Sequence, residues 1–237
     1  MPTCQGIMPW SLAEGSMDIV NLEACNLDIP FEYRFTCWFC GEGSYQTIVA
    51  SVSTHQQHYL VNMPICDECQ SYQCHRVANS LTSIEKLIKA KIVKCSVKEL
   101  AIGANWTEKE LQASDLNGSA FDGFKKSGWR MYLIAKDRLN YRGWPLSIDG
   151  ITIENGSLDE SYEFDGLTFS CFTTMVDYLS HSFALNKEFL KQVLMLYGNN
   201  KTIEAVKFCR LIPNNSAYQR EQALNELVAS LQEQKRR

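Results

Sequence analysis

Between residues 31 and 63, apolar and polar residues tend to alternate, and this period of two is typical of short strands. Between residues 31 and 37 every second residue is apolar, namely Phe31, Tyr33, Phe35 and Cys37. Two more short runs, 45–50 and 58–63, have strand character and are separated by the polar segment 51–57. The pattern therefore predicts three strands, the last two forming a hairpin.

A helical period follows after residue 80. An apolar stripe at helical spacing consists of Leu87, Ile88, Ile92 and Val93. Thr82 with Glu85 three residues later fits a capping box, and so does Thr107 with Glu110. The lysines of the first helix, including Lys89, fall mainly off its stripe, so we expect a solvated basic face.

Further helical segments are expected at 120–139, at 186–197 with Asn186 as its N-cap, at 201–211, and from 217 towards the basic C-terminus. Between them, residues 145–170 return to short alternating runs with Asp149-Gly150 and Asn155-Gly156 turn signals. This segment is acidic, and no lysine or arginine occurs between Arg142 and Lys187.

Composition narrows the class of protein. The chain has 237 residues, of which 45% are hydrophobic and 21% charged, and its net charge is -4. These values are typical of a globular protein and exclude a global basic field of the kind that coats nucleic acid. The N-terminus lacks the features of a secretory signal, and no apolar run is long enough for a membrane span, so we expect a cytoplasmic protein without membrane contact.

Ten cysteines are many for a chain expected in a reducing compartment. Four of them form two C-x-x-C pairs, Cys37 with Cys40 and Cys66 with Cys69. Two residues between thiols allow both to reach one ion from a tight turn, and zinc prefers four such ligands in a tetrahedron. Gly41 directly follows the first pair and can adopt the positive φ that such a turn needs.

The two pairs together predict one structural zinc ion. A catalytic zinc usually has three protein ligands and an open position, whereas four thiolates close the coordination shell. Four other side chains remain as reserve ligands: His55, His58, Cys74 and His75.

The order of strand, Cys37-Trp-Phe-Cys-Gly, hairpin, Ile65-Cys-Asp-Glu-Cys-Gln and helix is that of a treble clef. Residues 35–95 resemble the N-terminal zinc-binding domain of the ClpX unfoldase. The resemblance implies a platform for protein partners and, as one arrangement, a homodimer through this module. The chain has no G-x-x-x-x-G-K-[S/T] motif, so unfoldase activity does not follow.

Two other functions remain open. HNH nucleases also use treble clefs, and His55, His58, His75 and Asn79 are the residues that such a metal-dependent nuclease would need here. Segment 124–144 interleaves aromatic side chains with basic ones, which could bind nucleic acid: Lys125, Lys126, Arg130, Lys136, Arg138 and Arg142. Alternatively, the aromatic residues of this segment form a core stripe and the basic ones are solvated.

We therefore expect an α+β protein with an N-terminal arm (1–30), a small treble-clef zinc module (31–97) and a mostly helical domain (98–237) that contains a short β insertion near 145–170. Its expected role is that of a non-enzymatic interaction or regulatory protein. Trp38 and Phe39, at the tip of the first cysteine turn, are expected to be exposed and to bind the protein partner.

Overall fold

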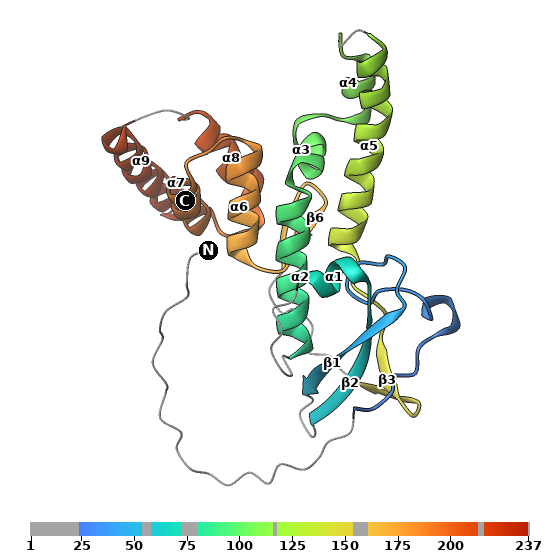
Figure 1. Cartoon of the computed structure of the whole chain (residues 1–237). Helices are drawn as coiled ribbons and strands as arrows, with labels where there is room; N and C mark the ends of the chain where they lie inside the picture. Colours follow the sequence, from blue (N-terminus) through green and yellow to red (C-terminus); the bar gives the residue numbers. More distant parts are fainter. Residues whose placement is uncertain are drawn as a thin grey trace, which may run out of the picture.

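The computed structural model describes residues 24–53, 58–72, 80–115, 118–153, 161–212 and 216–236. Its fold is α+β, as predicted: a mainly helical body is combined with small antiparallel strand pairs. The strand pair β1–β2 lies at one end of the molecule, and α4 with the tip of α5 lies at the other (Figure 1). Helix α6 lies beside α2 and α3, and α7 to α9 lie on the same side of the molecule (Figure 1).

The predicted hairpin is present. Strand β1 (Gln46–Ser53) pairs antiparallel with β2 (His58–Ile65), in a register that joins Gln46 to Ile65 and Ser53 to His58. Cys25 adds a parallel bridge to the free edge of β2, because its amide donates to the Leu60 carbonyl over 2.7 Å. The end of the N-terminal segment is thus part of this layer.

The strand predicted at 31–37 is wrong. A 3₁₀ turn, η1 (Phe31–Tyr33), stands there instead, and Phe31 and Phe35 are exposed. The turn presents Tyr33 to Trp144, and the two rings stack with centroids 5.0 Å apart. A contact made more than a hundred residues away thus overrides the local alternation.

Helix α2 (Leu81–Cys95) lies beside β1, with Ile84, Ile88 and Ile92 on its buried face. Its N-cap is Ser80, whose hydroxyl accepts from the Ser83 amide, so the capping box predicted at Thr82 is wrong. Glu85 is buried one turn into the helix and has no capping role.

Helices α3 (Val97–Asn105), α4 (Glu108–Ala113) and α5 (Ser119–Asn140) follow, and α5 packs on α2, α3 and α4. The capping box of Thr107 and Glu110 is confirmed at the start of α4. Helix α5 has Tyr132, Ala135 and Leu139 on its buried side. This agrees in part with the alternative interpretation, in which the aromatic residues of segment 124–144 form a core stripe.

The β insertion is confirmed and consists of two hairpins. Strands β3 (Leu146–Ile148) and β4 (Ile151–Ile153) turn at Asp149-Gly150, and β5 (Tyr162–Phe164) and β6 (Leu167–Phe169) turn at Asp165-Gly166. Both turns have positive φ at both positions, which is why Asp-Gly is favoured there. The Asn155 turn signal falls outside the described residues.

The remaining helices are α6 (Phe172–Ser182), α7 (Lys187–Tyr197), α8 (Thr202–Arg210) and α9 (Ala217–Arg236), with a 3₁₀ turn η2 (Asn199–Lys201) before α8. Asn186 caps α7, as predicted: its side-chain oxygen accepts from the Phe189 amide over 3.0 Å. Among the described helices, none combines the length and the apolar character needed to cross a bilayer.

The core is continuous from the cysteine layer to the last helices. One cluster of buried side chains includes Cys37, Ile65, Ile88, Leu146 and Val193. Residues 141–153 lie against the segment 25–45, as the Asp28 amide donating to the Ser147 carbonyl over 2.9 Å illustrates. The predicted helical domain therefore contributes part of the packing around the cysteine pairs.

Candidate metal centre

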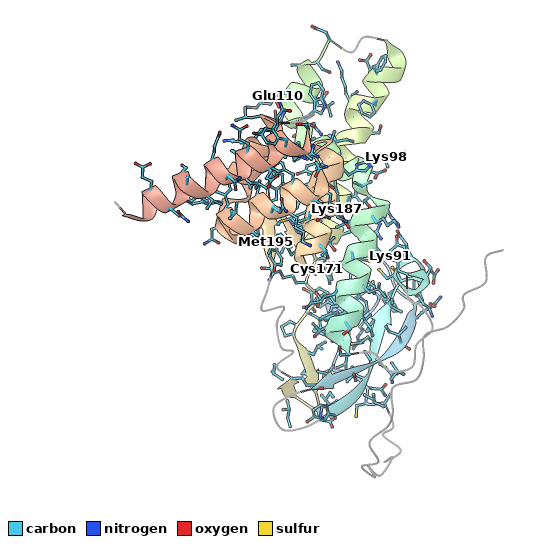
Figure 2. All side chains as sticks on the ribbon, turned by 90° about the vertical axis from the view of Figure 1, so that its left-hand side faces the viewer. Lys91, Lys98, Glu110, Cys171, Lys187 and Met195 are labelled. Atoms are coloured by element: carbon cyan, nitrogen blue, oxygen red, sulfur yellow. The ribbon has the colours of Figure 1, made fainter. Side chains whose placement is uncertain are left out.

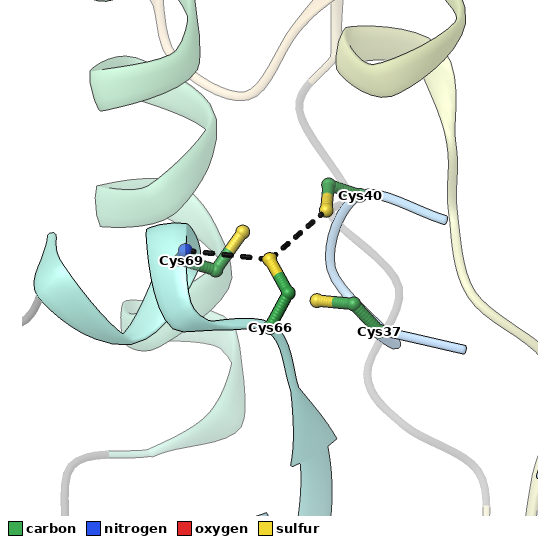
Figure 3. Close-up of side chains that lie close together, drawn as sticks. All are labelled: Cys37, Cys40, Cys66 and Cys69. Carbon is green, nitrogen blue, oxygen red and sulfur yellow. Dashed lines mark hydrogen bonds between the residues drawn. The ribbon is translucent and has the colours of Figure 1, made fainter. Parts of the chain in front are cut away.

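The four cysteines of the two C-x-x-C pairs meet at one point, as predicted. The sulfur atoms of Cys37, Cys40, Cys66 and Cys69 all lie within 4.8 Å of one another, and all four residues are buried (Figure 3). The sulfurs of Cys40 and Cys66 are 3.7 Å apart. Such a cluster could hold one metal ion.

Two backbone turns aim these sulfurs at each other. In the first, the Cys37 amide donates to the Glu42 carbonyl and the Gly41 amide to the Cys37 carbonyl. Gly41 has φ = 79°, so the predicted left-handed residue after the first pair is confirmed. In the second, Cys66 is the N-cap of α1 (Asp67–Ser71), and its sulfur accepts from the Cys69 amide over 3.4 Å (Figure 3).

The hairpin brings the two turns together. The Trp38 amide donates to the Pro64 carbonyl over 3.1 Å, and the Ser44 hydroxyl donates to the Ile65 carbonyl over 2.7 Å. The first turn is thereby held to the end of β2, directly before Cys66. Pairing of Gln46 with Ile65 therefore places both cysteine pairs at the same end of the hairpin.

Hydrogen bonds among the four thiols shift their pKa values in opposite directions. A hydrogen bond with Cys40 lowers the pKa of Cys37 to about 7, and the hydrogen bond from Cys37 lowers the pKa of Cys66. Hydrogen bonds with Cys37 raise the pKa of Cys40 and of Cys69. Because metal ligands must be thiolates, binding of an ion would release the protons of the thiols.

Arg138 of α5 links the two halves of the cluster. Its guanidinium lies 2.6 Å from a carboxylate oxygen of Glu68, between the second pair of cysteines, and 3.9 Å from Glu42, beyond the first pair. Its side chain is only 14% exposed. Burial opposes the charge, but the bond with Glu68 raises the pKa of Arg138, so it is a cation at any physiological pH.

Lys89 of α2 is a second basic residue near the cluster, and it is buried. It is 5% exposed, and its ammonium donates to the carbonyls of Arg138 (2.9 Å) and Tyr141 at the C-terminus of α5. Burial lowers the pKa of Lys89 to about 8, although Glu85 and the thiolates favour its charge. The expectation that the lysines of this helix are solvated is therefore wrong for Lys89.

Trp38 and Phe39 are buried, so the expectation that they are exposed is wrong. They are 4% and 1% exposed, and their rings meet edge to face at 5.4 Å. The Trp38 indole N–H donates to the Trp144 carbonyl over 3.0 Å. These aromatics join the cysteine turn to residues 143–144 and offer no surface to a partner in this conformation.

The six basic residues proposed for nucleic acid do not share one surface. Lys125 is buried and donates to the Ser114 carbonyl over 2.7 Å, and Arg138 is paired as described above. Lys136 lies over the Tyr132 ring, with its ammonium 5.7 Å from the ring centroid. The exposed members of the set are Lys126, Arg130 and Arg142.

The reserve ligand His58 is remote from the cluster. Pairing with Ser53 places it at the opposite end of the hairpin, seven strand residues from Ile65, or about 23 Å. Its Nδ1 lies 2.7 Å from the Ser53 hydroxyl. The other residues considered for the metal or for a nuclease, His55, Cys74, His75 and Asn79, lie outside the described residues.

Arg138, Lys89 and Trp144 complete the surroundings of the cluster, a role that the sequence did not predict for any of them. Local sequence patterns carry no signal for this role, because the partners of these side chains lie far away in the sequence. Within the parts of the chain that the structure describes, the four cysteines form the one group of metal-ligating side chains.

Comparison with known proteins adds no relative. No protein-family model, no curated protein and no solved structure matches this chain. The resemblance to the ClpX zinc-binding domain therefore stays a prediction from the cysteine motifs. What the structure establishes is an α+β protein with a buried Cys4 cluster that could hold one metal ion.

Proposed function

We propose that this chain is a non-enzymatic interaction or regulatory protein whose Cys4 cluster binds one structural Zn²⁺. The observation that supports this most directly is the convergence of four buried sulfurs within 4.8 Å of one another. Zinc takes four thiolates in a tetrahedron, and that set leaves no coordination position for water or substrate.

The surroundings suit such an ion. Four thiolates and one Zn²⁺ carry a net charge of about -2, and burial of that charge is costly unless cations lie nearby. Arg138 and Lys89 supply two positive charges from two different helices. The ion would cross-link the two cysteine turns, and the two cations would balance the negative charge of the metal–thiolate site.

The proposed role of the ion is to hold a shape. The cysteine turns position Trp38, Phe39 and the hairpin. Trp38 in turn contacts residues 141–153 through its hydrogen bond to the Trp144 carbonyl. Small metal-stabilised modules of this kind commonly serve as binding platforms, and the resemblance to the ClpX domain agrees with a protein partner. A homodimer is one form that such a partnership could take.

The experiment is metal analysis of the purified protein and of matched cysteine variants. We expect about one zinc per chain in the natural protein and less than about one tenth of that in Cys66→Ser, together with a lower melting temperature. Cys95→Ser removes an exposed cysteine outside the cluster and should retain the metal.

Two results would contradict the proposal. The first is a natural protein that is folded and contains no metal after purification under reducing conditions without chelators. The second is an equal zinc content in Cys66→Ser and Cys95→Ser, which would place the ion elsewhere.

A further inference from the structure

A groove with a volume of about 460 Å³ lies between α2 and α6, on the face of α2 opposite Lys89. Its floor is apolar and includes Val93, Val97 and Tyr178. Leu87, on its rim, is 37% exposed, although a leucine is normally buried. An open apolar groove of this size in a described surface indicates a binding site.

On both walls of the groove, the lining residues recur at the spacing of one helix face. Helix α2 contributes Leu87, Ala90, Lys91 and Lys94, which are at positions i, i+3, i+4 and i+7. These residues lie on one face of the helix, over two turns and about 10 Å of its length.

The opposite wall repeats this spacing. Helix α6 contributes Thr174, Asp177, Tyr178 and His181, again at i, i+3, i+4 and i+7. Two packed helices that each turn such a face to the same groove leave the place that a third helix fills in a bundle. The geometry therefore suits a helix better than an extended peptide.

The charged residues on the rim of the groove indicate which charge a bound helix should have. Lys91 and Lys94 line one wall, and the acidic residue of the other wall, Asp177, already forms an ion pair with Lys187 of α7. Figure 2 labels Lys91 and Lys187 on the side of the molecule that contains α2, α6 and α7. The rim thus has a net positive charge while the floor is apolar.

We propose that this groove binds an amphipathic helix of a protein partner, with apolar residues on one face and acidic residues beside them. The apolar face would cover Leu87 and the floor, and the acidic residues would pair with Lys91 and Lys94. The proposal rests on the interaction role proposed above and names its surface, but it does not depend on the metal.

The test measures binding of two synthetic peptides of about 15 residues by fluorescence anisotropy. Both have leucine at helical spacing; one has glutamate at the flanking positions and the other has lysine. We expect the acidic peptide to bind at least about tenfold more tightly, with an affinity that falls as salt is raised.

Variants of the natural full-length chain locate the site. Leu87→Gln should weaken binding of the acidic peptide about fivefold or more, because it removes an apolar anchor at the rim. Lys91→Glu combined with Lys94→Glu should reverse the preference and favour the basic peptide. Lys126→Glu makes the same kind of charge change at an exposed position of α5, outside the groove lining, and should alter the affinity less than about twofold.

The proposal fails if neither peptide binds, if both bind equally, or if the charge-reversed variant keeps the original preference. It also fails if decanoate binds in the groove while both peptides do not, because the occupant is then a small amphipathic anion. Zinc content is measured in every variant: loss of peptide preference with zinc retained overturns the groove alone, whereas absence of zinc overturns the proposed metal role alone.

Discussion

Trp38 shows how a single residue ties the cysteine turn to the rest of the chain. Its indole is buried, donates to the Trp144 carbonyl, and lies against the Gly143 backbone. A Cβ atom added at Gly143 would lie 2.5 Å from the indole ring, and the residue has φ = 71°. Glycine is required there both by conformation and by space.

This contact gives a prediction at the residue scale. Gly143→Ala should lower the free energy of unfolding by about 2–4 kcal/mol, because left-handed strain and the clash with Trp38 act together. Gly150→Ala is the matched control: its φ is 77°, but an added Cβ meets nothing within 4 Å. That variant should lose only the conformational part, about 1 kcal/mol. Urea denaturation of both variants checks this, and equal losses would contradict the clash.

At the scale of elements, the C-terminus of α5 contributes charged and hydrogen-bonded contacts beside the cysteine cluster. Arg138 contacts both halves of the cysteine cluster through Glu42 and Glu68. Lys89 of α2 donates to the last carbonyls of α5, where the dipole of α5 favours a cation. The two basic side chains thus fix α2, α5 and the cysteine turns relative to one another.

The strength of this support can be measured by a double-mutant cycle. Arg138→Gln and Glu68→Gln should show a coupling energy of roughly 0.5–1 kcal/mol, because the arginine is largely shielded while Glu68 is about half exposed. The exposed pair of Asp177 and Lys187 is the comparison and should show a smaller coupling, since solvent and salt screen it. A coupling for Arg138 and Glu68 no larger than that of the exposed pair would count against a supporting role.

At the scale of the whole molecule, the buried cluster runs without interruption from the cysteine layer through α2 and β3 to α7. The β3–β4 hairpin belongs by sequence to the second half of the chain and by packing to the cysteine end. A metal that holds the cysteine turns should therefore stabilise two separate stretches of sequence.

Metal removal tests this arrangement. After treatment with a chelator, we expect faster hydrogen exchange in residues 36–72 and also in 141–153, because both lose their support together. Exchange in α7 and α8 should change little, since these helices pack mainly on each other. The measurement is hydrogen exchange followed by mass spectrometry, and an unchanged rate in 141–153 would show that the hairpin is held independently of the metal.

The sequence by itself determined the features that depend on neighbouring residues. The cysteine spacing, Gly41, the Thr107 and Asn186 caps and the Asp149-Gly150 turn all follow from local geometry, and the structure confirms them. The α+β class followed from hydrophobic periods in the same way. In each case the physical cause lies within a few residues of the chain.

Tertiary structure alone decided the rest. Whether a basic or aromatic side chain is buried depends on what lies opposite it. Trp38, Lys89 and Arg138 were expected at the surface from the sequence, but Trp38 and Lys89 are buried and Arg138 is largely shielded. The turn at Phe31–Tyr33 replaced an expected strand because Tyr33 stacks on Trp144. Local patterns carry no information about such distant partners, and those partners determine which faces are buried and where a groove remains open.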